Sequence, residues 1–564
     1  MVASPERDVA LRKARGAFFT PPAIADYLAK FAVADNPEAR VFDPTCGEAV
    51  FLLAAGRRLR ELGRSPADLQ QQLYGVDLHQ ESLTAAQELL GRVGLDAHLL
   101  AMDFFTMHSP DQLDCPLPEM DAIIGNPPFI RYQEHVGGAR KASLHAALSQ
   151  GVRLSGLASS WAASLVHACS FLKRDGRLTM VLPAELLTVN YAEPVRRWLR
   201  RRFASVNLVL FERLQFADAL ENVVLIVAWG FGGCESFSLY HVADAGDLPR
   251  LGPFIQVNAA PIDGQKWTQL LLSLPHRQLY NAVTQEHFVR LGAYGAPELG
   301  TVTGANHFFT LGEDVRMRYG LQEGVHVRRT SPPGTRHLQG LSFTKGQWEE
   351  LRDAGEAVWL LDPESDQVSP DLQAYLDHGV QLGVPSAYKC RVRSPWWRPP
   401  VVPKPDLFFT YMSHRYPRLV ANDADVTFVN SMHGVRLRPS GPKPAKRALP
   451  LLALNSVTML GAEVHGRSYG GGVLKMEPRE AAGLPVPSPK MLDAAWDRLK
   501  DERDRLDREL RDGLWTNVVK RVDEVLLHQT MGIRAGDVIE LQKAAQQLRE
   551  RRLRRKTVAV SHAR

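Results

Sequence analysis

The chain has 564 residues, more than one hydrophobic core usually covers, so we expect two or three domains. Its 45% hydrophobic and 23% charged residues are typical of a globular protein, and its net charge of +6 is compatible with a polyanionic partner without establishing one. The five scattered cysteines include no C-x-x-C pair, which argues against a zinc ribbon or a disulfide framework and predicts a cytoplasmic location. No signal-peptide pattern and no apolar run of about 18 residues occur, so no membrane span is expected.

The first 240 residues alternate predicted strands with predicted helices. Strands are expected at 40–43, 73–78, 97–101, 121–124 and 177–183, followed by an antiparallel pair at 206–212 and 223–229. Thr20 is the expected N-cap of a first helix, with Pro21 at its first position. Further helices are expected at 82–93 and 159–173, a polar loop at 133–150 and a turn at 173–176. This alternation predicts right-handed βαβ crossovers and a parallel sheet.

Polar side chains follow the ends of the predicted strands. Asp43 and Asp77 come at the ends of the first two strands, Asp103 follows the third, and Asn126 follows the fourth. Ligands of parallel sheets bind outside the carboxyl ends of the strands, so we expect these side chains at one edge. A single strand-end Asp is more often a helix N-cap than a ligand, but three on successive strands favour a binding site. Carboxylates there can accept from ribose hydroxyls or an adenine amino group.

The fourth strand ends in an unusual corner, Gly125-Asn126-Pro127-Pro128-Phe129. The two prolines fix their φ angles and lack N–H groups, so the turn is stiff. Asn126 offers an acceptor oxygen, and Phe129 offers a flat apolar face. With the Pro127 carbonyl, Asn126 can accept both hydrogens of an exocyclic amine while Phe129 stacks on the base. The amine could then attack an electrophile without a general base; the alternative is a rigid strand-to-loop corner without a catalytic role.

This ordered set of motifs resembles the class I S-adenosylmethionine-dependent methyltransferases. Within them it is similar to the gamma-type DNA adenine-N6 methyltransferases of restriction–modification systems, which have a Thr-Pro-Pro segment ahead of the Asp-Pro turn. The resemblance covers about residues 14–230 and implies a Rossmann-like domain that uses S-adenosylmethionine. One departure is visible: the family turn usually reads Cys-Gly-Ser-Gly, whereas this chain has Cys46-Gly47-Glu48-Ala49.

The resemblance also implies roles for individual residues. The residues that would hold the methionine part of the cofactor are Phe18, Thr20, Asp43, Pro44, Thr45, Cys46 and Gly47. Those that would hold its nucleoside are Asp77 at the ribose and Asp103 and Phe104 at the adenine. Those that would hold the flipped target base are Asn126, Pro127, Pro128 and Phe129. Phe216 is a candidate second stacking ring for that base or, alternatively, a buried anchor of its own loop.

Beyond residue 245 the βαβ pattern stops, and segments rich in Pro, Gly and aromatic residues continue to about residue 490. Residues 388–398 interleave cations with aromatic rings, a pattern typical of phosphate contact and base stacking. The alternative is a basic surface strand with a buried Trp pair. The candidate DNA-binding residues are Lys389, Arg391, Arg393, Trp396, Trp397 and Arg398. This region more loosely resembles the target-recognition domains of restriction–modification methyltransferases.

From about residue 491 the sequence is helical. Leu492, Leu499 and Leu506 recur every seven residues, Leu510 and Leu514 extend the stripe, and further helices are expected at 518–528 and 536–555, before a basic tail. We therefore predict an α/β, Rossmann-like class I methyltransferase domain at 1–240 and a mixed α+β target-recognition domain at 245–490. A helical C-terminal region is predicted at 491–564.

The predicted function is methylation of adenine N6 in double-stranded DNA, as the modification component of a restriction–modification or related phage-defence system. Few residues precede the first motif, so a separate restriction endonuclease or further defence subunits are the expected partners, and no metal is expected. Two alternatives remain: a methyltransferase for RNA or a protein glutamine, and an inactive DNA-binding subunit. The long region after the catalytic domain disfavours the glutamine substrate, and retention of Asp77 with Asn126 to Phe129 disfavours an inactive subunit.

Overall fold

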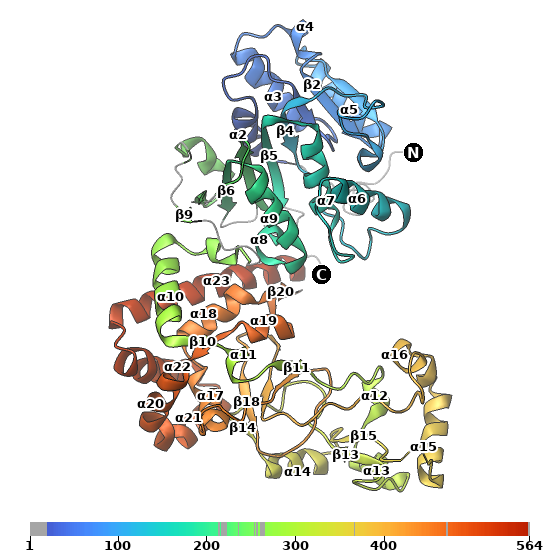
Figure 1. Ribbon diagram of the computed structural model, residues 1–564, viewed down its shortest axis with the longest axis vertical. Coiled ribbons are helices and arrows are strands. Elements are labelled where there is room, and N and C mark those ends of the chain that lie inside the picture. Colours follow the sequence, from blue (N-terminus) through green and yellow to red (C-terminus); the bar gives the residue numbers. More distant parts are fainter. Residues whose placement is uncertain are drawn as a thin grey trace. The chain divides into compact units, whose positions relative to one another are not determined.

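The computed structural model describes residues 20–211, 215, 223–234, 236–252, 254, 258–259, 266–365, 367–469 and 472–561 (Figure 1). The chain divides into two compact units, Met1–Leu271 (unit 1) and Leu272–Arg564 (unit 2). The finer division into three parts, at 240 and 490, stays a prediction.

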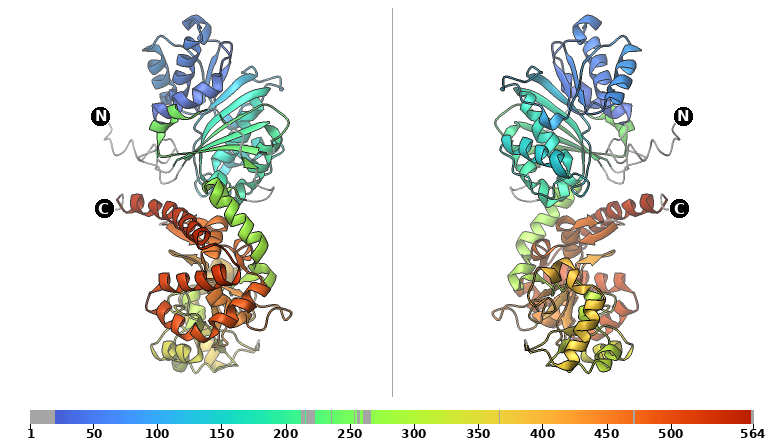
Figure 2. Two further views of the ribbon diagram at one scale, coloured as in Figure 1. Left: turned by 90° about the vertical axis from the view of Figure 1, so that its left-hand side faces the viewer. Right: turned by 90° about the vertical axis from the view of Figure 1, so that its right-hand side faces the viewer.

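The described residues of unit 1 form a nine-stranded sheet in the order β3-β2-β1-β4-β5-β7-β6-β8-β9. Figure 2 shows this sheet from two sides, in blue to green. The strands are β1 (Val41–Asp43), β2 (Leu73–Asp77), β3 (His98–Ala101), β4 (Met120–Gly125), β5 (Leu172–Pro183), β6 (Ser205–Phe211), β7 (Val223–Trp229), β8 (Ser236–Val242) and β9 (Asn258–Ala259). β3, β2, β1, β4 and β5 are parallel, and β7 is antiparallel to both β5 and β6. The predicted α/β fold and its antiparallel pair are confirmed.

Helices cover the sheet of unit 1 and build two cores. They are α2 (Pro22–Val33), α3 (Val50–Glu61), α4 (Pro66–Leu69), α5 (Gln80–Gly91), α6 (Gly137–Ser149), α7 (Ser160–Ala168), α8 (Glu185–Thr188), α9 (Glu193–Arg202) and the short η1 (Phe104–Thr106), η2 (Cys169–Phe171), η3 (Asn190–Ala192), η4 (Ala245–Arg250) and η5 (Thr268–Leu271). Val41 of β1 shares a core with Leu28 of α2 and Leu52 of α3. Its neighbour Phe42 points the other way, with its ring 5.3 Å from that of Phe171.

Three local predictions are wrong in this unit. The segment predicted as a polar loop at 133–150 contains helix α6, whose buried face is made of the small residues Ser143, Ala146 and Ala147. Small buried residues give almost no hydrophobic periodicity, so the helix was not visible in the sequence. The predicted turn at 173–176 lies inside β5, whose pairing with β4 shifts register there. Helix α2 begins at Pro22, so Pro21 rather than Thr20 occupies the N-cap.

Unit 2 contains four small sheets among its described residues, in the orders β10-β22, β11-β19-β16-β18-β14, β12-β15-β13 and β17-β21-β20. Their strands are β10 (Phe288–Arg290), β11 (Pro297–Leu299), β12 (Thr310–Leu311), β13 (Val327–Arg329), β14 (Ser342–Phe343), β15 (Trp359–Leu361), β16 (Leu407–Phe409), β17 (Met412–Ser413), β18 (Leu419–Asn422), β19 (His433–Val435), β20 (Arg467–Tyr469), β21 (Val473–Lys475) and β22 (Pro485–Pro487). Phe343 and Phe408 from the five-stranded sheet share a core with Trp359 from the three-stranded sheet beside it.

The helices of unit 2 include more long elements than the sequence predicted. They are α10 (Leu274–His287), α11 (Leu291–Tyr294), α12 (Asn306–Phe309), α13 (Glu313–Arg318), α14 (Lys345–Asp353), α15 (Pro370–Gln381), η6 (Val384–Ser386), α16 (Tyr388–Arg391), α17 (Ala445–Leu452), α18 (Ser456–His465), α19 (Pro478–Ala482), α20 (Pro489–Leu499), η8 (Lys500–Glu502), α21 (Arg503–Arg511), α22 (Trp515–Val522), the π-helix η9 (Asp523–Thr530) and α23 (Ala535–Ser561). The predicted leucine stripe is buried at Leu492, Leu499 and Leu506, whereas Leu514 is 49% exposed.

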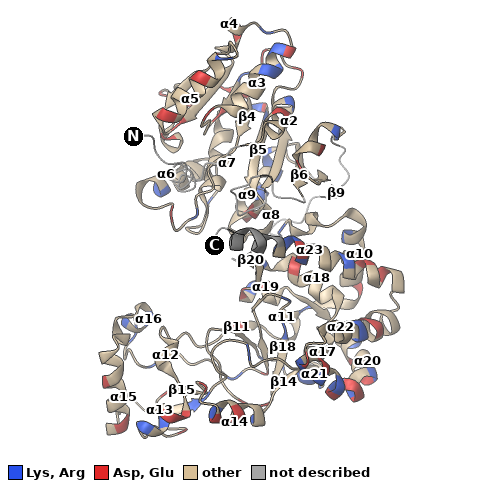
Figure 3. Cartoon of the chain, turned by 180° about the vertical axis from the view of Figure 1, so that it is seen from behind, with Lys and Arg blue, Asp and Glu red and all other residues tan. Residues whose placement is uncertain are grey.

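The C-terminal helices pack on the rest of unit 2. α20 contacts α17, and α23 contacts α18 and α10. Basic and acidic residues are interspersed along α20 to α22 (Figure 3), where ion pairs such as Arg521–Glu502 join neighbouring helices. The C-terminal helical region is therefore part of the same compact unit as the small sheets.

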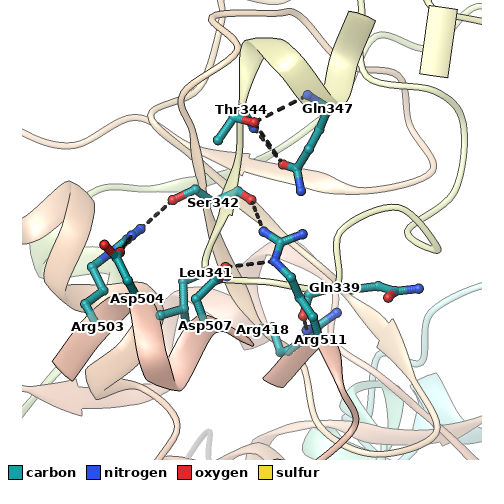
Figure 4. Close-up of polar contacts among 10 residues, drawn as sticks. All are labelled: Gln339, Leu341, Ser342, Thr344, Gln347, Arg418, Arg503, Asp504, Asp507 and Arg511. Atoms are coloured by element: carbon teal, nitrogen blue, oxygen red, sulfur yellow. Dashed lines mark hydrogen bonds and ion pairs between the residues drawn. The ribbon is translucent and has the colours of Figure 1, made fainter. Parts of the chain in front are cut away.

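Hydrogen bonds from side chains of α21 connect this helix to the edge strand β14 and the residue before it (Figure 4). Asp507 accepts from the backbone N–H of Leu341 through Oδ1, at 2.5 Å, and from Arg511 Nε through Oδ2, at 2.7 Å. Arg511 in turn donates to the carbonyl of Ser342 at 3.2 Å. Gly340 makes this approach possible, because a Cβ there would lie 2.2 Å from a guanidinium nitrogen of Arg511. This polar cluster satisfies an exposed sheet edge with side chains from the helix.

Candidate active site

The strand order brings the predicted polar residues to one edge of the unit 1 sheet. β1 pairs in parallel with β2 on one side and β4 on the other, so the carboxyl ends of the three strands coincide. Asp43 is the last residue of β1, Asp77 is the last residue of β2, and Asn126 directly follows β4. Asp103 follows β3, the strand beside β2, and stands at the start of η1.

Asp43 is a buried carboxylate that forms no ion pair with the described residues. Its side chain is 1% exposed, and Oδ1 accepts from the backbone N–H of Thr45 at 3.1 Å. Asp43 Oδ2 and the hydroxyl oxygen of Thr45 are also buried, and neither has a hydrogen-bond partner among the described residues. Burial raises the pKa of Asp43 to about 8; the Thr45 hydrogen bond lowers it, and the nearby charge of Asp77 raises it further. The pair of orphaned oxygens suits a ligand that brings positive charge and hydrogen-bond donors.

Asp43 also touches the end of β4. A Cβ at Gly125 would lie 2.7 Å from Asp43 Oδ1, so glycine is required where the carboxylate passes the strand end. The turn after β1 and the corner after β4 are thus adjacent in space.

Asp77 holds the turn after β1 in shape. Its Oδ2 accepts from the backbone N–H of Gly47 at 3.0 Å, and its Oδ1 accepts from that of His79 at 2.8 Å. Gly47 has φ of +51°, and a Cβ there would meet no atom of the described residues within 4 Å. Each carboxylate oxygen of Asp77 keeps a lone pair that could accept from a further donor.

Ala49 replaces the second glycine of the family turn. It adopts the left-handed conformation, with φ of 63° and ψ of 28°, at the N-cap position of α3. For an L-residue this conformation costs about 1–2 kcal/mol, and burial of the methyl group returns about 0.8 kcal/mol. Burial of the methyl group therefore offsets only part of the cost of placing alanine where glycine is usual.

The turn after β3 places two neighbouring phenylalanines differently. Asp103 Oδ1 accepts from the backbone N–H of Phe105 at 3.0 Å and caps η1. Phe104 is 5% exposed and packs with its ring 4.6 Å from that of His167. His167 also contacts the Phe104 carbonyl at 3.1 Å, and burial lowers its pKa to about 4, so it is neutral. Phe105 was not among the predicted site residues, and it is the more exposed of the two phenylalanines.

The side chain of Asn126 is oriented by Thr20. Asn126 Nδ2 donates to the Thr20 hydroxyl at 3.3 Å, and Thr20 is itself 8% exposed. Asn126 Oδ1 is buried and has no hydrogen-bond partner among the described residues. Because Thr20 does not cap α2, its hydroxyl is available to the amide, a role that the N-cap prediction did not include. The amide therefore presents an unused acceptor at the end of β4.

The other end of the corner contacts helix α7. Phe129 is half-buried at the margin of the core that contains α2 and α3. The next residue, Ile130, donates its backbone N–H to the hydroxyl of Ser160 at 3.0 Å. Ser160 was not singled out from the sequence; the only signal was its position at the start of a predicted helix. Phe18 and Phe216, both predicted site residues, lie outside the described residues.

The predicted DNA-binding stretch in unit 2 divides into exposed and structural residues. Lys389 and Arg391 are exposed on α16, beside Tyr388, which is 65% exposed. Arg393 instead donates to the carbonyls of Thr303, at 2.6 Å, and Trp396, at 2.7 Å. The strand in the sequence alternative is wrong, because the stretch begins with a short helix, whereas Trp397 of its expected buried Trp pair is buried.

The remaining members of that stretch also pack inward. Arg398 donates to the carbonyl of Pro363 at 3.0 Å, and Trp397 is 7% exposed. Trp396 packs with its ring 5.7 Å from that of Phe308. These side chains support the core of unit 2.

The described part of the chain contains neither a metal-binding cluster nor a membrane-spanning helix. No group of three or more His, Cys, Asp or Glu side chains there is arranged to hold a metal ion. None of its helices combines the length and apolar character needed to cross a lipid bilayer.

Comparisons with known proteins match both parts of the chain. Residues 9–209 match the N-6 DNA Methylase family, and residues 264–527 match the C-terminal domain of the Type II methyltransferase M.Eco57I. A solved structure of the Type IIL restriction-modification enzyme MmeI in complex with DNA is similar with a TM-score of 0.54 and 14% identity, over 97% of this chain and 78% of that one. This similarity supports the fold.

Two curated relatives align over most of their own lengths. The Type II methyltransferase M.XamI of Xanthomonas campestris pv. amaranthicola is 24% identical over 85% of this chain and 86% of the relative. The Type II methyltransferase M.AccI of Acinetobacter calcoaceticus is 19% identical over 83% of this chain and 84% of the relative. With the strand order and the Asn-Pro-Pro-Phe corner, these matches identify residues 9–209 as a domain of the N-6 DNA Methylase family and show that the chain is a DNA methyltransferase related to those of Type II restriction–modification systems.

Proposed function

We propose that this enzyme transfers a methyl group from S-adenosylmethionine to the N6 amine of a flipped adenine in double-stranded DNA, as the modification component of a restriction–modification system. The observation that carries the proposal is the unused acceptor of Asn126, held at a strand end beside the Asp43 turn. An acceptor buried without a partner is unfavourable by about 1–3 kcal/mol unless a ligand supplies a donor.

The turn after β1 fits the proposed cofactor. The orphaned oxygens of Asp43 and Thr45 can accept from the ammonium group of its methionine part, and the space beside Gly47 admits a ligand against the backbone. Asp77 can accept from ribose hydroxyls with its remaining lone pairs. Asp103, with Phe104 or the more exposed Phe105, is left for the adenine. When bound, the cofactor supplies an electrophilic methyl carbon.

The corner then orients the acceptor amine. Asn126 Oδ1 and the Pro127 carbonyl each accept one hydrogen of the adenine N6 amine, which directs the nitrogen lone pair toward the methyl carbon. Phe129 stacks on the base. A bond forms from nitrogen to carbon while the carbon–sulfur bond breaks, and the nitrogen loses a proton afterwards, so no general base is needed. The protein contributes position and polarisation.

DNA contact is proposed at α16 and its surroundings. From residue 378 to 405 the chain has five cations, Lys389, Arg391, Arg393, Arg398 and Lys404, and no Asp or Glu. Lys389, Arg391 and the exposed Tyr388 and Val392 form one surface of this segment, while Arg393 and Arg398 are engaged by backbone carbonyls. Exposed cations beside an exposed ring match the chemistry of phosphate contact and base stacking.

The experiment that tests the proposal is transfer of a tritiated methyl group to duplex DNA, RNA and protein in parallel. We expect labelled duplex DNA, with N6-methyladenine as the modified nucleoside after digestion and mass spectrometry. Labelled cytosine would contradict the adenine assignment, and label confined to RNA or protein would favour the alternative substrates. Absence of both transfer and cofactor binding would indicate an inactive DNA-binding subunit. Sequencing of modified DNA would then identify the recognition sequence.

A further inference from the structure

We propose that Ser160 is a positioning residue for methyl transfer: it holds the segment from Pro128 to Ile130 on the first turn of α7 and thereby fixes the orientation of Phe129 and Asn126. This inference rests on the proposed role of the Asn-Pro-Pro-Phe corner in holding the target base. It concerns the support of the corner, since Ser160 itself is placed against backbone groups and not against the ligand.

The corner needs support from outside because it has little of its own. Residues 126–130 belong to no strand or helix. Pro127 and Pro128 have no N–H group, so two consecutive positions cannot donate to a neighbouring strand or turn. The prolines limit the φ angles of the corner but not the direction in which the whole segment leaves β4. The contacts made at its two ends therefore contribute to that direction.

Ser160 makes those contacts at the far end. Its hydroxyl accepts from the backbone N–H of Ile130 at 3.0 Å and donates to the backbone carbonyl of Pro128. Its own backbone N–H donates to the carbonyl of Ile130 at 3.0 Å. The three hydrogen bonds bracket Phe129 on both sides. At the near end, the Thr20 hydroxyl holds the Asn126 amide, as described above.

Helix α7 is a rigid platform for this contact. All nine of its residues are buried, and Ser160 itself is 2% exposed. The indole N–H of Trp161 donates to the hydroxyl of Tyr191 at 3.0 Å, which ties the first turn of the helix to η3. Hydrogen bonds to such a buried element hold the corner in one place, because the platform has no free surface along which to move.

The consequence for catalysis follows from the geometry of in-line displacement. The amine, the methyl carbon and the leaving sulfur have to be aligned, and a displacement of about 1 Å can cost about 100-fold in rate. Loss of the Ser160 hydroxyl removes the two side-chain hydrogen bonds to the corner and keeps the backbone one. We therefore expect the segment to stay in contact with α7 but to adopt more than one orientation.

The test compares Ser160→Ala with Ser164→Ala. Ser164 lies one turn along the same helix, is 1% exposed, and donates to the Ser160 carbonyl at 3.2 Å without touching the corner. It is therefore a matched control for losing a buried hydroxyl from α7. We expect Ser160→Ala to lower the single-turnover rate of methyl transfer at saturating DNA about 10- to 100-fold relative to Ser164→Ala. Cofactor Kd and Tm should stay alike in the two variants.

Ser160→Thr provides the rescue, because it keeps a hydroxyl at the same position. It should recover most of the lost rate, and 2-aminopurine at the target position should report a flipped base in all three variants. Single-turnover rates of Ser160→Ala within twofold of Ser164→Ala would overturn the inference. A parallel loss of rate and Tm in all three variants would also overturn it, since a general packing role would then suffice. Asn126→Ala separates the two proposals: full activity in that variant would refute the role of the corner itself.

Discussion

Asp43 and Asn126 are two polar side chains that the folded chain leaves incompletely satisfied next to each other. Asp43 accepts one hydrogen bond through Oδ1, and Asn126 donates one through Nδ2, while Asp43 Oδ2 and Asn126 Oδ1 are buried without a partner among the described residues. Buried polar atoms in folded proteins are nearly always paired, so orphans that share one sheet edge are best explained by a ligand. Their chemistries differ, since a carboxylate suits a cation and a neutral amide oxygen suits an amine donor.

The raised pKa of Asp43 predicts proton release when the cofactor binds. At pH 7 a carboxyl with a pKa of about 8 is mostly protonated, and a cationic ligand requires it to ionise. Affinity for S-adenosylmethionine should therefore rise with pH by up to about tenfold per unit below pH 8 and level off above it. Calorimetry in buffers of different ionisation enthalpy should detect the released proton at pH 7. Asp43→Asn should abolish both the proton release and the pH dependence.

The same shift has an opposite effect on the stability of the enzyme without cofactor. The folded pKa lies above the unfolded value of about 3.9, so the contribution of Asp43 to stability is full below pH 4 and is lost as pH rises through 8. Asp43→Asn should remove this loss, and its Tm should fall less between pH 5 and 9 than that of the wild type. If the Tm of the wild type and that of Asp43→Asn changed equally between pH 5 and 9, the raised pKa of Asp43 would be contradicted.

Asn126→Ala should abolish methyl transfer and leave cofactor binding near normal. The substitution removes the acceptor for the target amine, whereas the turn after β1 is held by hydrogen bonds from its backbone N–H groups to Asp43 and Asp77. Methyl transfer to duplex DNA and calorimetric binding of S-adenosylmethionine measure the two effects separately. Undiminished turnover in this variant would count against the role of Asn126.

Among the elements, α21 shows how a short edge strand is kept paired. β14 has two residues and one strand neighbour, β18. Without α21, its other edge would be open to solvent or to another chain. Side chains from α21 occupy that edge, with Asp507 accepting from Leu341 and Arg511 donating to Ser342 (Figure 4). The helix thus replaces a strand partner, and the C-terminal region contributes to unit 2 by covering an edge.

Asp507→Ala should lower the free energy of unfolding of unit 2 by about 1–3 kcal/mol, because it leaves the Leu341 N–H without an acceptor and frees Arg511. The matched control is Asp504→Ala on the same helix, whose side chain is 88% exposed and whose loss should cost under about 0.5 kcal/mol. Urea denaturation followed by tryptophan fluorescence compares the two. Equal stabilities would show that the cluster in Figure 4 contributes nothing beyond surface charge.

At the scale of the whole molecule, cofactor chemistry and DNA contact are assigned to different units. The orphaned acceptors belong to unit 1, and the exposed cations of α16 belong to unit 2. Each function should therefore be separable by substitution, provided that the affected unit stays folded.

The double substitution Lys389→Ala with Arg391→Ala should weaken binding to duplex DNA and leave the Kd for S-adenosylmethionine unchanged. Loss of two phosphate contacts should reduce the slope of log K against log salt by about 2. Lys345→Ala with Arg534→Ala is a charge-matched control, because both of those cations are exposed elsewhere in unit 2. DNA affinity measured at several salt concentrations distinguishes them; identical slopes in the two double variants would refute contact at α16.

Much of the catalytic unit could be predicted from the sequence. The alternation of strands and helices, together with the right-handedness of βαβ crossovers, was enough to place Asp43, Asp77 and Asn126 at one sheet edge. Unit 2 was far less predictable. Its strands have two to four residues, too few for a hydrophobic period to emerge, and helices such as α10 and α18 were not foreseen.

The alternation of strands and helices, the identity of the corner and the acids at the strand ends were determined by the sequence itself, because these depend on local patterns and on crossover geometry. Tertiary structure alone decided which polar atoms remain free. Thr20 and Asn126 are 106 positions apart, and Ile130 and Ser160 are 30 apart, so no local pattern records that they bond. It also decided that Arg393 faces backbone carbonyls while Lys389 faces solvent, since hydrogen bonding between distant segments depends on how the chain packs.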